Sequence, residues 1–345
     1  MLVGVRRLVE IPLWENRYLN YLLHRIAPEF VTVPDSKWSF HYQWRRAARN
    51  VAIPDVIYSR SFPSSSALMA LKLKKAFKVP WIMHLSDPWA DSPLRRDSPR
   101  VRAKNQKLER ACFENADVVC LTSQKTIDFY SKKYPGVRYE LFPNVYDPED
   151  RADSFEVPRN RKLRLVHTGA LASIRSPETF LQALQGLPPE VQDELEVIFC
   201  GFADRGVLAL FEKYRCKCFS FRGVLTAREV LELQRSADVL ILIDFVAKGD
   251  LGMFFLSKIL DYMLARKYIL ALTGLGSECE DVIQGRFGDC FEHDDISGIQ
   301  AKIRDLIEVH KRDPGLFVRN LIDSRYDAAL CAARLTELFR EFSVL

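Results

Sequence analysis

Short apolar runs alternate with amphipathic stretches along nearly the whole chain. In the first half, runs rich in β-branched and aromatic residues are expected to be buried strands at residues 55–59, 81–84 and 117–121. The second half has counterparts at residues 163–167, 195–199, 239–243 and 268–272. Helical patterns lie between them at residues 66–77, 101–115, 123–134, 177–185, 226–235 and 255–265. Buried strands that alternate with helices predict an α/β fold with doubly wound parallel sheets.

A polar interval at residues 146–162 interrupts this alternation. It contains Pro148, Pro158 and five acidic residues, which is typical of a linker. A chain of 345 residues also exceeds what one hydrophobic core usually covers. We therefore expect two Rossmann-like domains, at residues 1–150 and 151–325, that bind ligands in a cleft at the carboxyl ends of their strands. Residues 326–345 are expected to form a C-terminal helix that packs back on the first domain.

The composition is that of an ordinary globular protein, with 48% hydrophobic and 28% charged residues. The net charge of +5 is small for this length and does not indicate a nucleic-acid partner. No apolar stretch approaches the roughly 18 residues of a membrane span, and residues 1–7 lack the apolar core of a signal peptide. Cys216 and Cys218 lie two apart without a nearby His/Cys cluster, so we expect free thiols and no metal site. These features predict a cytoplasmic protein.

The segment at residues 257–262 places charged residues in an otherwise apolar helix. Lys258 lies near the predicted helix start, where a cation opposes the helix dipole. An anion bound at the same place would offset that repulsion, and Asp261, three residues on, shares the helix face. The pattern indicates a site for a ligand with phosphates and hydroxyls. A simple ion pair between Lys258 and Asp261 is the structural alternative.

A second candidate phosphate contact follows the strand at residues 163–168. Gly169 at the strand end would let the backbone approach a phosphate, and Arg175 would clamp it with two N–H donors. Ser176 is the expected N-cap of the next helix, with Pro177 at its first position. An ordinary structural turn is the alternative, because every doubly wound domain has such turns.

In the first half, polar residues gather where the strand at residues 81–84 ends. Asp87 is expected at its carboxyl end, while His84 and Ser86 would share one face if the strand continues. Polar side chains at a strand end above a cleft favour a catalytic role for them. A satisfied structural histidine and an Asp-Pro turn are the alternatives.

An ordered set of motifs resembles family 4 glycosyltransferases over about residues 54–285. The set is PDVIYSRS at 54–61, HLSDPW at 84–89, FPNVYD at 142–147, HTG at 167–169 with Arg175, FRGV at 221–224, ADVL at 237–240 and SKILDY at 257–262. The resemblance implies a retaining, metal-independent GT-B enzyme that transfers a sugar from a UDP- or GDP-sugar to an acceptor. It implies no cofactor apart from that donor substrate.

The resemblance also implies roles for individual residues. Lys258 and Arg175 match the cations on the donor diphosphate, and Gly169 matches the loop glycine. Asp261 stands where the family commonly has a Glu on the ribose hydroxyls. Ser257, in the Ser-Lys motif, is a further donor-side position. Val224 and Leu225 fall where the family usually holds the nucleobase by backbone. Asp87 and His84 lie near the catalytic or acceptor-side polar group.

Two departures from the family pattern stand out. The first acid of the family's carboxylate pair is replaced by Met253, and neither Asp244 nor Asp250 has the right spacing. A contact to the sugar ring is then expected from backbone around residues 252–254. Residues 1–50 lack a clear opening strand and glycine loop, so we expect an N-terminus shortened by one strand-helix unit.

Residues 1–50 are instead rich in aromatic and basic side chains, including Trp38, Trp44, Arg45 and Arg46. They are expected either to face a membrane surface, as in enzymes with lipid-linked acceptors, or to pack between domains. The acceptor is accordingly a saccharide or a lipid-linked saccharide, in polysaccharide or glycoconjugate biosynthesis. Two other classes stay open, a GT-B sugar-nucleotide epimerase and a non-catalytic nucleotide-sugar-binding subunit, the latter favoured by Met253.

Overall fold

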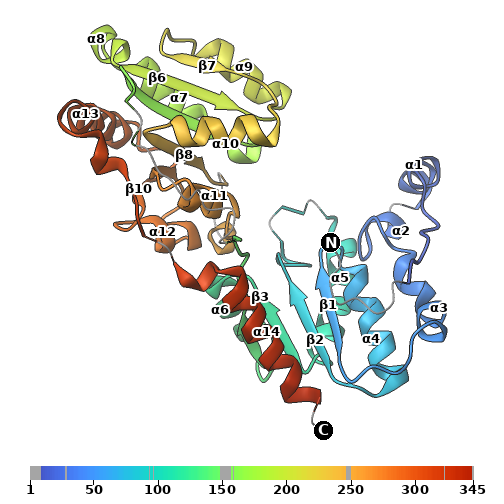
Figure 1. Cartoon of the computed structure of the whole chain (residues 1–345). Coiled ribbons are helices and arrows are strands. Elements are labelled where there is room, and N and C mark those ends of the chain that lie inside the picture. Colours follow the sequence, from blue (N-terminus) through green and yellow to red (C-terminus); the bar gives the residue numbers. More distant parts are fainter. Residues whose placement is uncertain are drawn as a thin grey trace. The chain divides into compact units, whose positions relative to one another are not determined.

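The computed structural model describes residues 9–27, 29–92, 94–95, 97–147, 157, 159–245, 250–321 and 323–343. The chain forms two compact units (Figure 1). Unit 1 comprises Met1–Asn144 and Cys331–Leu345, and unit 2 comprises Val145–Leu330. Most of the linker predicted at residues 146–162 lies outside the described residues.

Unit 1 is built on a parallel sheet of order β1-β2-β3-β4. Its strands are β1 (Ile57–Ser61), β2 (Trp81–Leu85), β3 (Val118–Leu121) and β4 (Tyr139–Leu141). Side chains alternate between the two faces of β2, because successive residues of a strand point in opposite directions. Trp81 and Met83 pack in the core with α4 (Ser65–Phe77), α5 (Pro99–Phe113) and α6 (Gln124–Lys133). Ile82 faces the other side, where it packs with Leu338.

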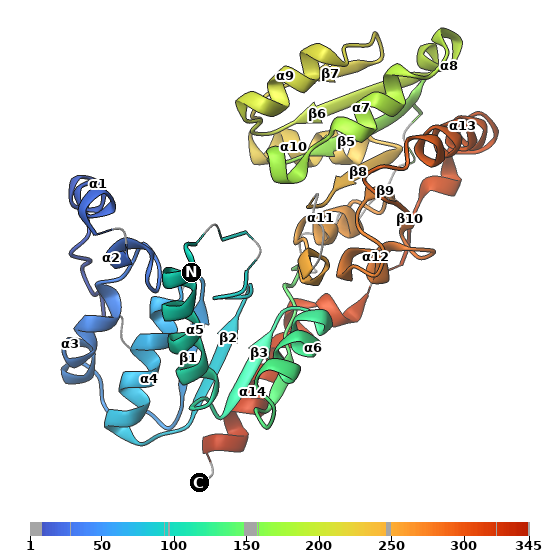
Figure 2. The ribbon, with the colours of Figure 1, turned by 180° about the vertical axis from the view of Figure 1, so that it is seen from behind.

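Leu338 belongs to α14 (Ala328–Ser343), the last helix of the chain, which covers the second face of the unit 1 sheet (Figures 1 and 2). An ion pair between Arg138 and Glu341 and an edge-to-face contact between Tyr58 and Phe339 add to this packing. The described part of the chain before β1 holds helices and no strand. They are α1 (Arg17–Ile26), α2 (Glu29–Thr32), the 3-10 helix η1 (Phe40–Gln43) and α3 (Trp44–Arg49).

Unit 2 has a parallel sheet of order β10-β9-β8-β5-β6-β7. The strands are β5 (Leu163–Thr168), β6 (Leu195–Cys200), β7 (Phe219–Phe221), β8 (Val239–Ile243), β9 (Tyr268–Leu272) and β10 (Gly288–Phe291). The chain runs outward from β5 to β7 and then returns, so that β8 pairs with β5. The ends of β5 and β8 are therefore the point where the strand order reverses, which is where ligands bind in such sheets.

Helices cover both faces of the unit 2 sheet, with α7 and α10 on opposite sides (Figures 1 and 2). They are α7 (Glu178–Gln185), α8 (Pro189–Asp193), α9 (Arg205–Lys213), α10 (Ala227–Ser236), α11 (Lys258–Leu264), α12 (Glu278–Ile283) and α13 (Ile296–Arg312). Alternate strand residues such as Leu165, Val197 and Ile241 join α7, α9 and α13 in the main core. The predicted α/β fold with two parallel sheets is thus confirmed, and the strand order reverses in unit 2 but not in unit 1.

The structure also differs from the sequence prediction in places. The sequence pattern does not predict the strands β4, β7 and β10. Each has only three or four residues, most of them half-buried, which is too short for a recognisable apolar run. The helix expected at 255–265 begins only at Lys258, after a 3-10 turn, η4 (Asp250–Met253). Within the described residues, no helix combines the length and the apolar character needed to cross a bilayer.

Candidate functional site

The carboxyl edge of the unit 2 sheet is built from closely packed backbone. Gly169 follows β5 and Gly201 follows β6, with φ angles of +118° and +128°. The N–H of Gly169 donates to the carbonyl of Cys200 at 2.8 Å, and the N–H of Gly201 donates to the carbonyl of Gly223 at 2.7 Å. A Cβ at Gly201 would come within 2.9 Å of the Gly169 Cα. Only glycine permits this backbone conformation and this approach.

Lys258 extends over the end of β5. A Cβ built at Gly169 would lie 2.8 Å from Cε of Lys258 and closer still to its Nζ. The lysine amino group therefore rests directly on the strand end, in the space that the missing side chain leaves. The phosphate contact that the sequence predicts at Gly169 stays a prediction.

The register of α11 determines where Lys258 lies. Tyr262, one turn further along the helix, is fully buried. Its hydroxyl donates to the Ile241 carbonyl at 3.1 Å and accepts the Thr168 N–H at 3.3 Å. Because residues four apart share a helix face, this clamp directs Lys258 toward the end of β5.

Arg175 approaches the same strand end from the loop after β5. It closes a 3-10 turn at Ser173–Arg175, and its guanidinium lies 4.1 Å from the ring centroid of Phe245, which follows β8. The helix after it begins at Glu178 with Pro177 as N-cap, one position later than predicted. Ser176 still contributes a cap-like bond, since its Oγ accepts the Glu178 N–H at 3.2 Å.

The electrostatics of Lys258 reflect this crowding of cations. Burial, and then the nearby Arg175, lower the pKa of Lys258 to about 8, although Asp261 acts in the opposite direction. The neighbouring His167 is fully buried, and its Nδ1 lies 3.0 Å from the Ile241 carbonyl. Burial and then Lys258 hold the pKa of His167 well below its usual range, so this ring stays neutral. Lys258 and Arg175 are both half-buried, and like charges held close together disfavour each other's charged form.

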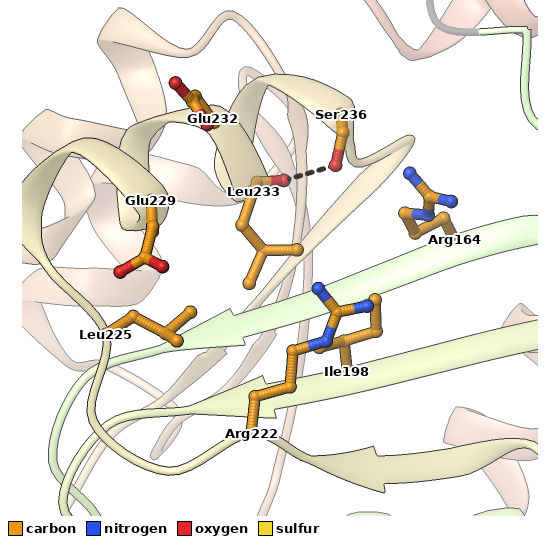
Figure 3. A pocket seen from close by; sticks show the side chains of 8 residues that line it. All are labelled: Arg164, Ile198, Arg222, Leu225, Glu229, Glu232, Leu233 and Ser236. Atoms are coloured by element: carbon orange, nitrogen blue, oxygen red, sulfur yellow. Dashed lines mark hydrogen bonds between the residues drawn. The ribbon is translucent and has the colours of Figure 1, made fainter.

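The other predicted donor-side residues are more exposed than Lys258 or lie in a separate pocket. Asp261 and Ser257 are exposed, and the Ser257 side chain makes no capping hydrogen bond. Val224 is exposed just beyond β7, and Leu225 lines a pocket of about 400 Å³ between the sheet and α10 (Figure 3). Arg164 and Arg222 also line that pocket, and it includes no other predicted site residue.

Met253 stands where the family resemblance implies a first acid. Met253 is buried in η4. The Asp244 carboxylate is buried as well and accepts hydrogen bonds from Thr273 Oγ1 and the Phe245 N–H, both at 2.7 Å. Burial raises the pKa of Asp244. The Asp244 carboxylate therefore stabilises the fold through these two hydrogen bonds. The Asp250 side chain lies outside the described part of the structure.

In unit 1, the predicted acceptor-side residues follow β2. Ser86 joins three strand ends, since its N–H and Oγ donate to the Ser61 carbonyl at 3.2 and 2.9 Å and its carbonyl accepts from Thr122 Oγ1 at 2.7 Å. Asp87 comes next and is exposed at this carboxyl edge, as the sequence predicts. These hydrogen bonds fix the backbone of Ser86 and so the position of the following residue, Asp87.

The rest of this loop is fixed by Glu109, a fully buried carboxylate of α5. Its oxygens accept hydrogen bonds from the hydroxyls of Tyr130 and Tyr134 at 2.9 and 2.8 Å and from the Ala90 N–H at 2.7 Å. Lys133 forms an ion pair with it. Sequence reasoning missed this residue, because one acid in an amphipathic helix carries no sign of burial.

His84 lies apart from that edge. It shares the α14-covered face of β2 with Ile82, and its Nδ1 lies 2.6 Å from the Tyr58 hydroxyl. Burial, and then the nearby Arg60, lower the pKa of His84 to about 4. The catalytic role of His84 stays a prediction, and its burial favours the structural alternative. Ser86 does not continue the strand face of His84, because β2 ends at Leu85.

Among the described residues, no group of three or more His, Cys, Asp or Glu side chains is placed to hold a metal ion. The cysteines are free thiols, including Cys216 and Cys218, whose sulfurs lie 3.4 Å apart.

Comparison with known families and structures identifies the fold. Residues 5–145 match the family model of the glycosyl transferase 4-like domain, which confirms the predicted family for this part of the chain. No curated protein sequence matches the chain.

Solved structures of GT-B glycosyltransferases match nearly the whole chain. HepE from Anabaena, solved with UDP and glucose, has a TM-score of 0.63 at 16% identity over 96% of this chain and 84% of its own. Sucrose-phosphate synthase from Thermosynechococcus elongatus has a TM-score of 0.63 at 16% identity over 95% and 80%. TarM has a TM-score of 0.63 at 10% identity over 88% of this chain. The match spans only 58% of the length of the TarM chain. The predicted GT-B fold is confirmed.

Proposed function

We propose that this chain, whose residues 5–145 carry a glycosyl transferase 4-like domain, transfers a sugar from a nucleoside diphosphate sugar to an acceptor. The observation that carries the proposal is the position of Lys258 over Gly169 with Arg175 beside it. Two cations brought together at the reversal point of a doubly wound sheet provide a binding place for a diphosphate. Structural neighbours solved with UDP support a uridine nucleotide as the first candidate.

The chemistry follows from the charge of the leaving group. As the glycosidic bond breaks, negative charge grows on the diphosphate oxygens. Cations already aimed at that position stabilise this charge without reorganisation, and removing one such donor typically costs about 10²- to 10³-fold in rate. Lys258 and Arg175 would therefore act on the leaving group, with no metal required. Asp261 would hold the ribose hydroxyls, and backbone near Val224 and Leu225 would hold the base.

We further propose a retaining reaction on a saccharide or lipid-linked saccharide. The first family acid is absent at Met253, so a contact to the donor sugar would come from backbone at residues 252–254 rather than from a carboxylate. Asp87, exposed at the strand edge of unit 1, is the candidate polar group on the acceptor side. The donor sugar would be supplied as a UDP- or GDP-sugar.

A thermal-shift screen with UDP, GDP and their sugars tests the donor site, since a ligand that binds only the folded state raises the melting temperature. We expect one nucleotide series to raise it and Lys258→Ala to abolish that shift. Lys311→Ala is the control, because Lys311 forms only exposed ion pairs in the same unit. A folded sample without a shift for any nucleotide would remove the proposal.

The buried Met253 also favours a second candidate, a non-catalytic nucleotide-sugar-binding subunit. An assay for nucleoside diphosphate release separates the two. A transferase releases the diphosphate faster when a saccharide acceptor is added. A binding subunit shows the thermal shift without acceptor-dependent release, and both effects would depend on Lys258.

A further inference from the structure

Two cysteines meet in the short turn between α9 and β7. The Sγ atoms of Cys216 and Cys218 lie 3.4 Å apart, which is close enough for one thiol to donate a hydrogen bond to the other. The turn is closed by the Phe219 N–H, which donates to the Cys216 carbonyl at 3.3 Å. The proposed sugar transfer uses neither thiol, so the contact between them has a separate role or none.

The two thiols differ in exposure. Cys218 is only 7% exposed and belongs to the main core of unit 2. Its carbonyl accepts the Val197 N–H at 2.7 Å, which fixes it to β6. Cys216 is half-buried at the border of the same core. Apart from Cys216 and Cys290, all cysteines of the chain are buried. A reagent from solvent therefore reaches Cys216 more readily than Cys218.

Cys216 also lines a pocket of about 810 Å³ beside β7, the edge strand of the unit 2 sheet (Figure 1). Phe211, Phe219 and Phe221 line the same pocket, whereas Cys218 belongs to the core. Pockets that bind small molecules have volumes of about 300 to 1,000 Å³ and mostly apolar walls. This pocket can therefore bring a small molecule to Cys216.

Local hydrogen bonds favour the thiolate of Cys216. The hydrogen bond from the Cys218 side chain lowers the pKa of Cys216 below that of an ordinary thiol. Burial opposes this effect, and the N–H groups of Cys218 and Phe219 add to it. The same contact between the thiols, and then burial, raise the pKa of Cys218. Because the thiolate is the nucleophile in disulfide exchange, Cys216 would react first.

The turn has the dimensions that a disulfide requires. Residues two apart in a chain are separated by at most about 7 Å between their Cα atoms. A disulfide needs about 4.4 to 6.8 Å between Cα atoms and about 2.05 Å between sulfurs. The sulfurs of Cys216 and Cys218 need to approach only from 3.4 Å to that length. The bridge is therefore within reach of this turn without a change in the path of the chain.

We propose that Cys216 and Cys218 form a reversible disulfide by exchange with a low-molecular-weight disulfide that enters this pocket. The Cys216 thiolate attacks one sulfur of that molecule, whose S–S bond breaks and releases one small thiolate. Cys218 then loses its proton and attacks the Cys216 sulfur of the mixed disulfide, which releases the second small thiolate. The protein pair gives up two electrons and two protons, and the small disulfide becomes two thiols.

Treatment of the reduced full chain with glutathione disulfide tests this inference without any transferase assay. We expect the wild type to lose the mass of two hydrogen atoms and to release two molecules of reduced glutathione per chain. After denaturation, iodoacetamide should alkylate every cysteine except Cys216 and Cys218. Trypsin cuts after Lys217, between the two cysteines, so the two peptides should stay joined until a reductant is added.

Single variants separate the two steps. Cys218→Ser should stop at the mixed disulfide, in which Cys216 retains one glutathione because no thiol displaces it. Cys216→Ser should slow the oxidation at least about tenfold, since the remaining thiol is buried. Cys290→Ser is the matched control and should react like the wild type. Cys290 is also half-buried in unit 2, but burial raises its pKa to about 12.

Circular dichroism shows whether each variant is folded, and the wild-type peptides decide the question even where a variant is not. The proposal is overturned if the folded wild type keeps both thiols, or if Cys216 is joined to a cysteine other than Cys218. Consumption of glutathione disulfide by Cys216→Ser at the wild-type rate would overturn it as well.

Discussion

The amino group of Lys258 occupies the space that a side chain at position 169 would need. A Cβ on residue 169 would lie 2.8 Å from Cε of Lys258, and closer to its Nζ, in a backbone conformation of φ +118° that favours glycine. The strand end and the cation are therefore complementary in shape. This relationship ties the proposed diphosphate site to a single missing methyl group.

Gly169→Ala should displace Lys258 and weaken nucleotide diphosphate binding at least about tenfold, because the grip on the diphosphate would be lost. Isothermal titration with UDP or GDP measures the change. Gly285→Ala is the control, since Gly285 also has a positive φ, +70°, with nothing within 4 Å of its Cβ position. Both variants should lose about 1 kcal/mol or more of stability, and equal nucleotide affinity in the two would contradict the role of Gly169.

Nucleotide affinity should fall as the pH rises through about 8. In the free protein, burial and Arg175 lower the pKa of Lys258 to about 8, so the amino group loses its proton above that pH. A diphosphate favours the protonated form, and binding at higher pH must take up a proton. We expect roughly tenfold weaker binding for each pH unit between about 8 and 10.

Lys258→Arg is the matched variant for that measurement, since a guanidinium stays protonated throughout this range. Its binding should be weaker at pH 7, because the longer planar group fits the space over Gly169 poorly. Its pH profile should nevertheless be flat between pH 7 and 9.5. A flat wild-type profile would show that Lys258 does not contact the nucleotide phosphates.

Glu109→Ala should destabilise unit 1 by about 3 to 5 kcal/mol, because two buried tyrosine hydroxyls and the Ala90 N–H lose their shared acceptor and Lys133 keeps only Asp91 as an ion-pair partner. Urea denaturation measures this loss. Glu114→Ala on the same helix removes only an exposed ion pair with Arg110 and should cost less than about 1 kcal/mol. Similar midpoints for the two variants would rule out the proposed network.

His84 should make the protein less stable in acid. Burial lowers its pKa to about 4 in the folded state, against 6.5 for an ordinary histidine. Between these two pH values the unfolded chain is protonated at His84 and the folded chain is not. Above pH 6.5 both states are neutral and the residue has no effect. Between pH 6.5 and 4 the destabilisation grows to on the order of 3 kcal/mol.

The His84→Gln variant isolates this effect, because it keeps a polar side chain that does not titrate. Its unfolding free energy should fall less steeply than that of the wild type between pH 6.5 and 4.5. Parallel profiles would mean that His84 is protonated in the folded protein, and its catalytic alternative would gain support. Other titrating groups affect both proteins equally, so the difference reports on His84.

Much of the fold follows from local pattern. The buried strands β8 and β9 match their predicted residues 239–243 and 268–272, because a continuous apolar run bounded by polar residues leaves little choice. Asp87 could likewise be placed beyond a strand end from order along the chain. The motif around Lys258 predicts a phosphate contact from sequence alone, and that role stays a prediction.

The tertiary structure decided which residues meet. Gly169 and Lys258 are distant in sequence, and they come together because β8 returns beside β5 and Tyr262 pins α11 there. His84 is buried because α14, from the far end of the chain, covers its face of the sheet. On α1, Leu19 and Leu23 are half-buried, whereas Tyr18, Tyr21 and Leu22 on the other side stay exposed. Sequence patterns specify which side chains favour burial, whereas the choice of packing partner depends on the path of the whole chain.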